Sequence, residues 1–193
     1  MGLLIRHLTT EAIDALSKER KFAINTLGIS FEYQFALDSV NLNWYDLLYA
    51  IDNGYLSHLA AVEHAQHELG FEEIPDVLEL AILAPQETIY PQSIQPYISY
   101  LADRVSENEK KYAKQKLQYL VLKWMYERQA DFKNILEAVE FIYADFGHPQ
   151  NMASFIRYMP SMRPILATAD LRTDQMLKNW ASFLIEQESI FGK

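Results

Sequence analysis

The sequence predicts an all-α fold, in which antiparallel helical hairpins pack as a multi-helix bundle or a short helical stack. Glycine is scarce, with 6 in 193 residues, and two of these glycines stand where helices are expected to end. Apolar residues recur at helical spacing, most clearly at Leu117, Leu120 and Val121. The connections between predicted helices are short, which favours antiparallel neighbours. No segment has the pattern of a strand.

Capping residues and helix-ending residues set the predicted boundaries. The predicted helices span residues 11–27, 31–40, 44–53, 58–69, 76–84, 94–104, 107–128 and 131–145, then a short segment ending near 159, and finally 173–189. In the first half of the chain, Thr10, Asn43 and Ser57 are expected to cap helices, because their side-chain oxygens accept from free backbone N–H groups. Gly54 and Gly70 are expected to end two of them.

Prolines and one capping box organise the later helices. Pro75 suits the first turn of the helix over 76–84, and Pro85 is expected to stop it. Pro91 is assigned to a connector before the helix over 94–104. Ser106 and Glu109 form the S-x-x-E pattern of a capping box for the longest helix, 107–128.

A single domain over residues 1–193 is the simplest organisation for a chain of this length. We divide it into an acidic N-terminal lobe, about 1–104, and a mixed-charge C-terminal lobe, about 105–193. The absence of cysteine excludes disulfides, thiolate metal sites and a cysteine nucleophile. The N-terminal apolar run is too short for a signal peptide, and no stretch approaches the roughly 18 apolar residues of a membrane span. We therefore expect a soluble, cytoplasmic protein.

The charges are segregated along the chain. Residues 22–103 contain no lysine or arginine but 12 aspartates and glutamates, whereas residues 104–193 contain 13 basic and 11 acidic residues. Surfaces that serve solubility alone normally mix the two signs. A folded part whose charges are all negative repels nucleic acid and anionic lipid, and it attracts a basic protein surface.

The helix predicted over 44–53 suggests where such a partner binds. Its large apolar residues form the core stripe, so Tyr45, Tyr49 and Asp52 are predicted to face outward together, with Asp46 beside them. Tyrosine rings supply contact area and carboxylates meet lysine or arginine. A solvated acidic surface without a partner is the alternative. The predicted partner-binding residues are Asp38, Tyr45, Asp46, Tyr49, Asp52, Glu63, Glu68, Glu72, Glu73 and Asp76.

His64 and His67 are the candidate metal ligands of the chain. A zinc protease requires H-E-x-x-H and a di-iron bundle requires Glu-x-x-His on two helices, and the sequence has neither. Helical geometry places Gln66 toward the core with the large apolar residues, so both histidines are predicted to face outward beside Glu63 and Glu68. We expect no metal and no cofactor. A helical metal-dependent enzyme using His64 and His67 remains the alternative.

The sequence gives little support for nucleophilic catalysis, phosphate binding or nucleic-acid binding. The sequence lacks a nucleophile elbow and a phosphate-binding glycine loop, so we expect no enzymatic activity. Asp145 and Arg157 are predicted to form an ion pair that fixes a turn between helices. The one basic cluster, near Lys110 and Lys114, begins a helix that also carries glutamates, which is typical of a solvated face rather than a nucleic-acid site.

Four motifs carry a family resemblance that spans roughly residues 29–190. They are Leu42–Ala50, Leu78–Ala81, Tyr143–Phe146 with Pro149, and Arg157–Pro160. These motifs resemble a bacterial all-helical family of unknown function, whose members occur beside polymorphic or contact-dependent toxins and are regarded as candidate immunity proteins. The resemblance implies a stoichiometric inhibitor of a basic toxin, most simply a nuclease or ribonuclease of a contact-dependent growth inhibition system. It brings no catalytic residues with it. An acidic adaptor for another basic protein is the remaining alternative.

Overall fold

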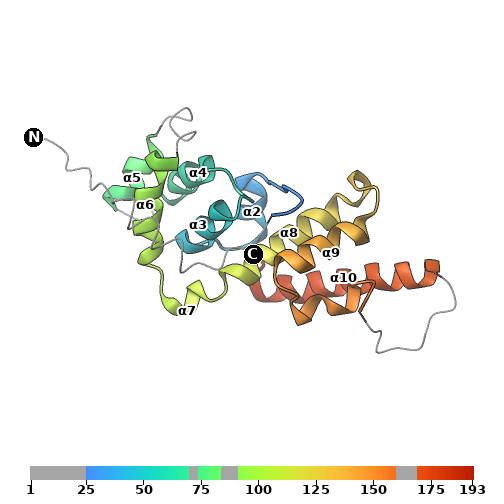
Figure 1. Ribbon diagram of the computed structural model, residues 1–193. Coiled ribbons are helices and arrows are strands. Elements are labelled where there is room, and N and C mark those ends of the chain that lie inside the picture. The colour runs from blue at the N-terminus through green and yellow to red at the C-terminus, as the bar shows by residue number, and fades with distance from the viewer. Residues whose placement is uncertain (1–24, 70–73, 84–90, 160–168) are drawn as a thin grey trace, which may run out of the picture. The chain divides into compact units, whose positions relative to one another are not determined.

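The computed structural model describes residues 25–69, 74–83, 91–159 and 169–193, with side chains in the last segment from Leu171 (Figure 1). Throughout these residues the regular structure is helical, and an isolated bridge between Val40 and Gly192 is the one β-type pairing among them. The all-α prediction is therefore confirmed. Of the helix predicted over 11–27, residues 11–24 lie outside the described residues, and residues 25–27 are not helical.

The helices match most of the predicted ranges. The first five are α2 (Tyr33–Ser39), α3 (Trp44–Asp52), α4 (Leu59–Glu68), α5 (Pro75–Ala81) and α6 (Pro91–Asp103). They are followed by α7 (Glu107–Lys110), α8 (Ala113–Glu127), the 3-10 helix η2 (Gln129–Asp131), α9 (Ile135–Asp145), the 3-10 helix η3 (Gln150–Phe155) and α10 (Ala169–Phe191). Within the described part of the chain, no helix is both long and apolar enough to cross a membrane.

Two predicted boundaries are wrong. Pro91 belongs to α6 instead of to a connector, and it is the first residue of that helix among the described residues. The helix predicted over 107–128 is two helices, interrupted between Lys110 and Ala113. Ser106 does not cap α7, because its hydroxyl donates to the Glu109 carboxylate rather than accepting from the backbone.

The described residues cluster into two compact units, which we call the first unit (residues 42–69, 74–83 and 91–113) and the second unit (residues 25–41, 114–159 and 169–193). Residues 25–41, which the sequence analysis placed in the acidic N-terminal lobe, thus belong with the C-terminal residues. Several contacts fix them there. The Thr26 N–H and hydroxyl donate to the Asp145 carboxylate, and the Arg128 guanidinium lies over the Phe35 ring.

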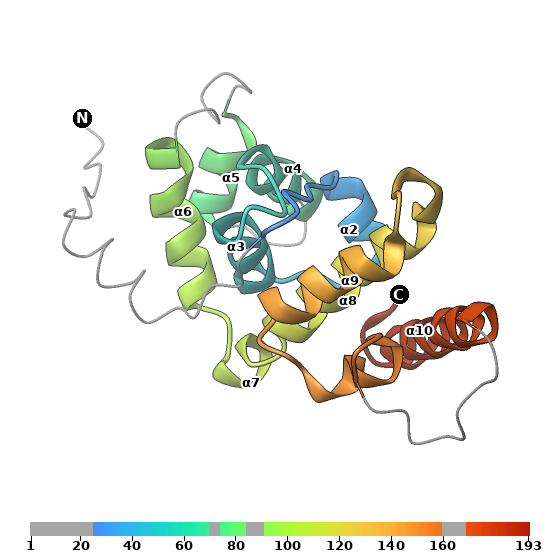
Figure 2. The same cartoon turned by 45° about the vertical axis from the view of Figure 1, so that its right-hand side comes forward.

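In the first unit, α3 packs against α4 and α6, and α5 packs against α4 and α6 (Figures 1 and 2). The predicted core stripe of α3 is confirmed, since Trp44, Leu47, Leu48 and Ile51 are all buried. Because α3 is covered from more than one side, its buried surface is wider than a single stripe.

In the second unit, α8 and α9 are joined through η2 and lie side by side in both views, while α10 packs against η3 (Figures 1 and 2). Trp180 of α10 is fully buried, stacked on Phe155 and edge-on to Tyr126. Arg157 pairs with Glu140 rather than with Asp145, so the predicted Asp145–Arg157 ion pair is wrong.

Candidate functional site

The start of α3 explains why Asp46, one of the residues predicted to face a partner, is buried. The Asn43 N–H donates to Asp46 Oδ2 at 3.1 Å, and the Asp46 N–H donates to Asn43 Oδ1 at 2.9 Å. This reciprocal pair is a capping box, so the Asn43 cap is confirmed. It also draws the Asp46 side chain inward, leaving that residue 3% exposed.

Tyr49 is likewise buried, at 7% exposure, because α3 has helices against several sides. The predicted outward orientation of Asp46 and Tyr49 is therefore wrong. Tyr45 stays partly exposed, but the Lys110 ammonium lies 5.6 Å from the centre of its ring. Lys110 also forms a 2.8 Å ion pair with Glu107, so part of the negative charge is compensated within the first unit.

The other predicted partner residues are distributed as follows. Asp52, Glu63, Glu68 and Asp76 are partly exposed in the first unit. Asp38 is exposed but belongs to the second unit, where its carboxylate accepts a bond from the Gln34 amide at 2.7 Å. Glu72 and Glu73 lie outside the described residues.

Asp52 has an electrostatic role that the sequence did not suggest. It raises the pKa of His58, but burial opposes it more strongly, so the pKa of His58 lies below its ordinary value. The end of α3 is therefore coupled by charge to the start of α4, and no separate partner is needed to explain where Asp52 lies.

The exposed apolar residues of α5 were not predicted as a site. Leu78 is 55% exposed and Ile82, just after the helix, is 73% exposed. They are four residues apart, so they lie on one side of the helix. Asp76 precedes them in the sequence and Glu79 lies between them, and Glu79 accepts a hydrogen bond from Tyr97 of α6. Burial, followed by this bond and the charges of Glu79 and Asp76, raises the pKa of Tyr97. We call Asp76, Leu78, Glu79 and Ile82 the α5 ridge.

The buried side of α4 also differs from the prediction. His64 is 2% exposed, whereas Gln66 is exposed and Leu69 is 44% exposed. Val62 is buried as predicted, but the rest of the core face is the alanine side of the helix, formed by Ala60, Ala61 and Ala65 with His64 among them. Small residues let neighbouring helices approach closely, and the His64 ring then packs edge-on against Trp44, with centroids 4.5 Å apart. The predicted outward orientation of His64 is wrong, while that of His67 is confirmed.

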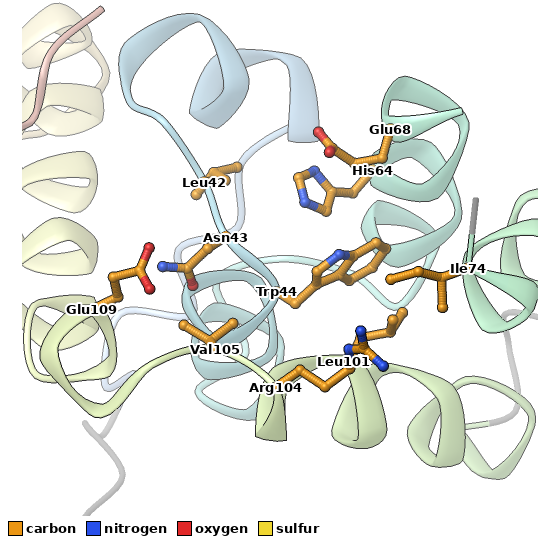
Figure 3. Close-up of a pocket in the computed structure, with 10 residues that line it drawn as sticks. All are labelled: Leu42, Asn43, Trp44, His64, Glu68, Ile74, Leu101, Arg104, Val105 and Glu109. Carbon is orange, nitrogen blue, oxygen red and sulfur yellow. The ribbon is translucent and has the colours of Figure 1, made fainter. Parts of the chain in front are cut away.

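His64 lines a pocket of about 340 Å³ in the first unit (Figure 3). The apolar lining comes from Leu42, Trp44, Ile74, Leu101 and Val105. Its polar lining residues are Asn43, His64, Glu68, Arg104 and Glu109. Figure 3 shows His64 and Glu68 side by side, one helical turn apart on α4, and Arg104 on the other side of Trp44.

His64, His67 and Glu68 form the one group of three histidine or acidic residues, in the part of the chain that the structure describes, whose potential ligand atoms lie together. These atoms are all within 4.8 Å of one another, and His67 Nδ1 is 3.2 Å from Glu68 Oε1. The two imidazole rings are nearly parallel, at 8°, with centroids 6.5 Å apart. Glu63, which the sequence analysis grouped with them, is not part of the cluster.

A family model matches most of the chain. Residues 33–188 match the model of a family described as "Uncharacterized protein conserved in bacteria (DUF2247)". No curated protein and no solved structure matches the chain.

Proposed function

We propose that this chain, which belongs to the bacterial family DUF2247, is an immunity protein: a stoichiometric inhibitor that binds a basic toxin domain, most simply a nuclease. The observation that carries the proposal is the distribution of charge between the two units. The described residues of the first unit contain 3 lysines and arginines against 9 aspartates and glutamates, whereas those of the second unit contain 9 against 11. The formal charges of the described residues are therefore −6 for the first unit and −2 for the second.

A net charge of this size on one compact unit favours a cationic partner. It raises the local concentration of a positively charged protein and speeds the encounter, by roughly 10- to 1000-fold at low salt. Rapid capture suits an inhibitor that acts before the toxin turns over substrate. The catalytic groove of a nuclease is basic because it binds phosphates, so an anionic protein surface is suited to occupy it.

The α5 ridge supplies the features expected of the contact surface itself. Leu78 and Ile82 are exposed apolar anchors, and Asp76 and Glu79 stand beside them in sequence. Buried apolar anchors contribute most of the affinity of an interface, while charges at its rim mainly set the association rate. The ridge replaces Asp46 and Tyr49, which are buried and provide no such surface.

The first experiment is growth rescue. The neighbouring genes are first searched for a large secreted protein with a variable C-terminal domain, and that domain is then expressed in a bacterial host, with or without this chain. Rescue by the chain, with a one-to-one complex on purification, is the expected result. Failure to rescue or to bind that domain contradicts the proposal.

The second experiment locates the surface by kinetics. Asp76→Lys with Glu79→Lys changes the described residues of the first unit from −6 to −2, removing two thirds of their net charge. If attraction scales with that charge, association at low salt slows by roughly 5- to 100-fold. Leu78→Ser with Ile82→Ser instead accelerates dissociation, by about tenfold for each anchor lost.

The matched control is Asp131→Lys with Asp174→Lys, which makes the same change in total charge on exposed residues of the second unit. Circular dichroism of each variant confirms folding. If the control slows association as much as the ridge variant, the attraction comes from the net charge of the whole chain and the ridge is not the contact surface.

A further inference from the structure

We propose that His64, His67 and Glu68 bind a divalent transition-metal ion, with Zn²⁺ the best chemical fit. This inference is independent of the toxin, because it concerns one helix end and the pocket beside it. Two imidazole nitrogens and one carboxylate oxygen are ligands that zinc accepts, and three protein ligands of this kind occur in zinc sites that keep a fourth position open.

One helix turn holds the three potential ligands as neighbours, since they occupy positions i, i+3 and i+4. Tetrahedral bonds of about 2.0–2.1 Å place neighbouring ligand atoms roughly 3.3 Å apart. His67 Nδ1 and Glu68 Oε1 are 3.2 Å apart in a hydrogen bond, and all three potential ligand atoms lie within 4.8 Å of one another. An ion would replace this hydrogen bond, and rotation of the side chains would bring the third ligand atom from within 4.8 Å to about 3.3 Å.

The most buried ligand is already held in place. His64 is packed edge-on against Trp44 and lines the pocket, so little conformational freedom is lost when it binds an ion. His67 is exposed and Glu68 is partly exposed, which leaves the ion a path from solvent. An ion can therefore first bind the two accessible ligands and then the buried imidazole of His64.

The electrostatic surroundings also favour a cation. No lysine or arginine occurs between residues 42 and 103, and Glu68 contributes a negative charge directly. Arg104 lines the same pocket but lies on the other side of Trp44 (Figure 3). Two of the three proposed ligands, His64 and Glu68, line the pocket of about 340 Å³, which has room for a water molecule as a fourth ligand.

Zinc binding to the full-length, tag-free chain tests the inference. The protein is dialysed against a chelator, titrated with Zn²⁺ by calorimetry, and analysed for bound zinc by elemental analysis. One ion per chain is expected. His67→Gln and Glu68→Gln each remove a ligand at a partly or fully exposed position, so each is expected to weaken binding by roughly 10- to 100-fold or more while the fold is kept.

The matched control is His58→Gln, on the residue that precedes α4 and lies outside the cluster, which is expected to bind zinc like the unaltered protein. The visible spectrum of a Co²⁺-loaded sample provides a second readout, because tetrahedral nitrogen and oxygen coordination gives intense bands that the two ligand variants lose. The inference is overturned if the unaltered chain holds no zinc, or if His67→Gln and Glu68→Gln bind it as tightly as His58→Gln does. Neither result bears on toxin binding, which is measured separately.

Discussion

The ion pair between Glu140 and Arg157 offers a direct test of how the second unit is held together. Arg157 Nε donates to Glu140 Oε1 at 2.8 Å and its Nη2 donates to Glu140 Oε2 at 2.9 Å, a bidentate arrangement. The sequence pattern had paired Arg157 with Asp145. In the structure, both oxygens of Asp145 accept from Thr26, at 2.8 and 2.6 Å. If Arg157 pairs with Glu140, the effects of substituting these two residues on the free energy of unfolding are not additive. If it pairs with Asp145, the non-additive effect appears between Arg157 and Asp145 instead.

The expected coupling between Glu140 and Arg157 is about 1 kcal/mol. Exposed ion pairs contribute roughly 0.2–1 kcal/mol, and bidentate geometry places this pair near the upper end. Screening prevents a larger value, because the Arg157 side chain is 39% exposed, although that of Glu140 is only 18% exposed. The hydrogen bond from Arg157 is the main cause that lowers the pKa of Glu140, and burial opposes it.

Urea unfolding of the Glu140→Gln, Arg157→Gln and double variants measures this coupling as a double-mutant cycle. Because the folded-state pKa of Glu140 is lowered, the coupling is fully present above about pH 4.5 and is lost as the pH falls through the lower folded value. The parallel cycle with Asp145→Asn and Arg157→Gln is expected to be additive within about 0.3 kcal/mol. A larger coupling in the Asp145 cycle than in the Glu140 cycle refutes this assignment.

Three further predictions concern stability. Asn43→Ala removes the α3 cap and is expected to lower the free energy of unfolding, measured in urea, by about 1 kcal/mol. Asn43→Gly is expected to lower it by only about a few tenths of a kcal/mol. Equal losses in the two variants contradict a capping role. Burial raises the pKa of Tyr119 to about 12, and the charge of Glu188 adds to the shift. The free energy of unfolding therefore falls as the pH rises above 10. In thermal melts, Tyr119→Phe is expected to remove this loss of stability at alkaline pH. Burial lowers the pKa of His58, so stability falls as the pH drops below 6.5. His58→Gln abolishes this acid loss and Asp52→Asn widens it, whereas an unchanged acid profile in both variants contradicts the predicted linkage.

The helices themselves were largely predictable, because the signals that set them are local. The Asn43 cap and the core stripe of α3 follow from residues within a few positions of each other, and both are confirmed. The break between α7 and α8 had no such signal, since the sequence there contains no proline or glycine. It falls next to the position in the chain where the two units divide.

The candidate site was less predictable because helical periodicity shows which residues share a face but not which face is covered. On α4 the larger apolar residues suggested a core face containing Gln66, yet the alanine side is buried and carries His64 inward. A run of small residues around a histidine was the available signal. On α3 the same reasoning placed the core stripe correctly but underestimated how widely the helix is buried, which removed Asp46 and Tyr49 from the predicted surface.

The sequence by itself determined the helical class and the segregation of charge, since the first depends on local propensity and the second is a property of composition. Only the tertiary structure decided which carboxylates belong to one unit, that Arg157 pairs with Glu140, and that His64 and Glu68 meet at a pocket wall. The physical reason is that burial depends on how closely neighbouring helices approach. That approach is set by the partners of each helix, which lie far away in the sequence.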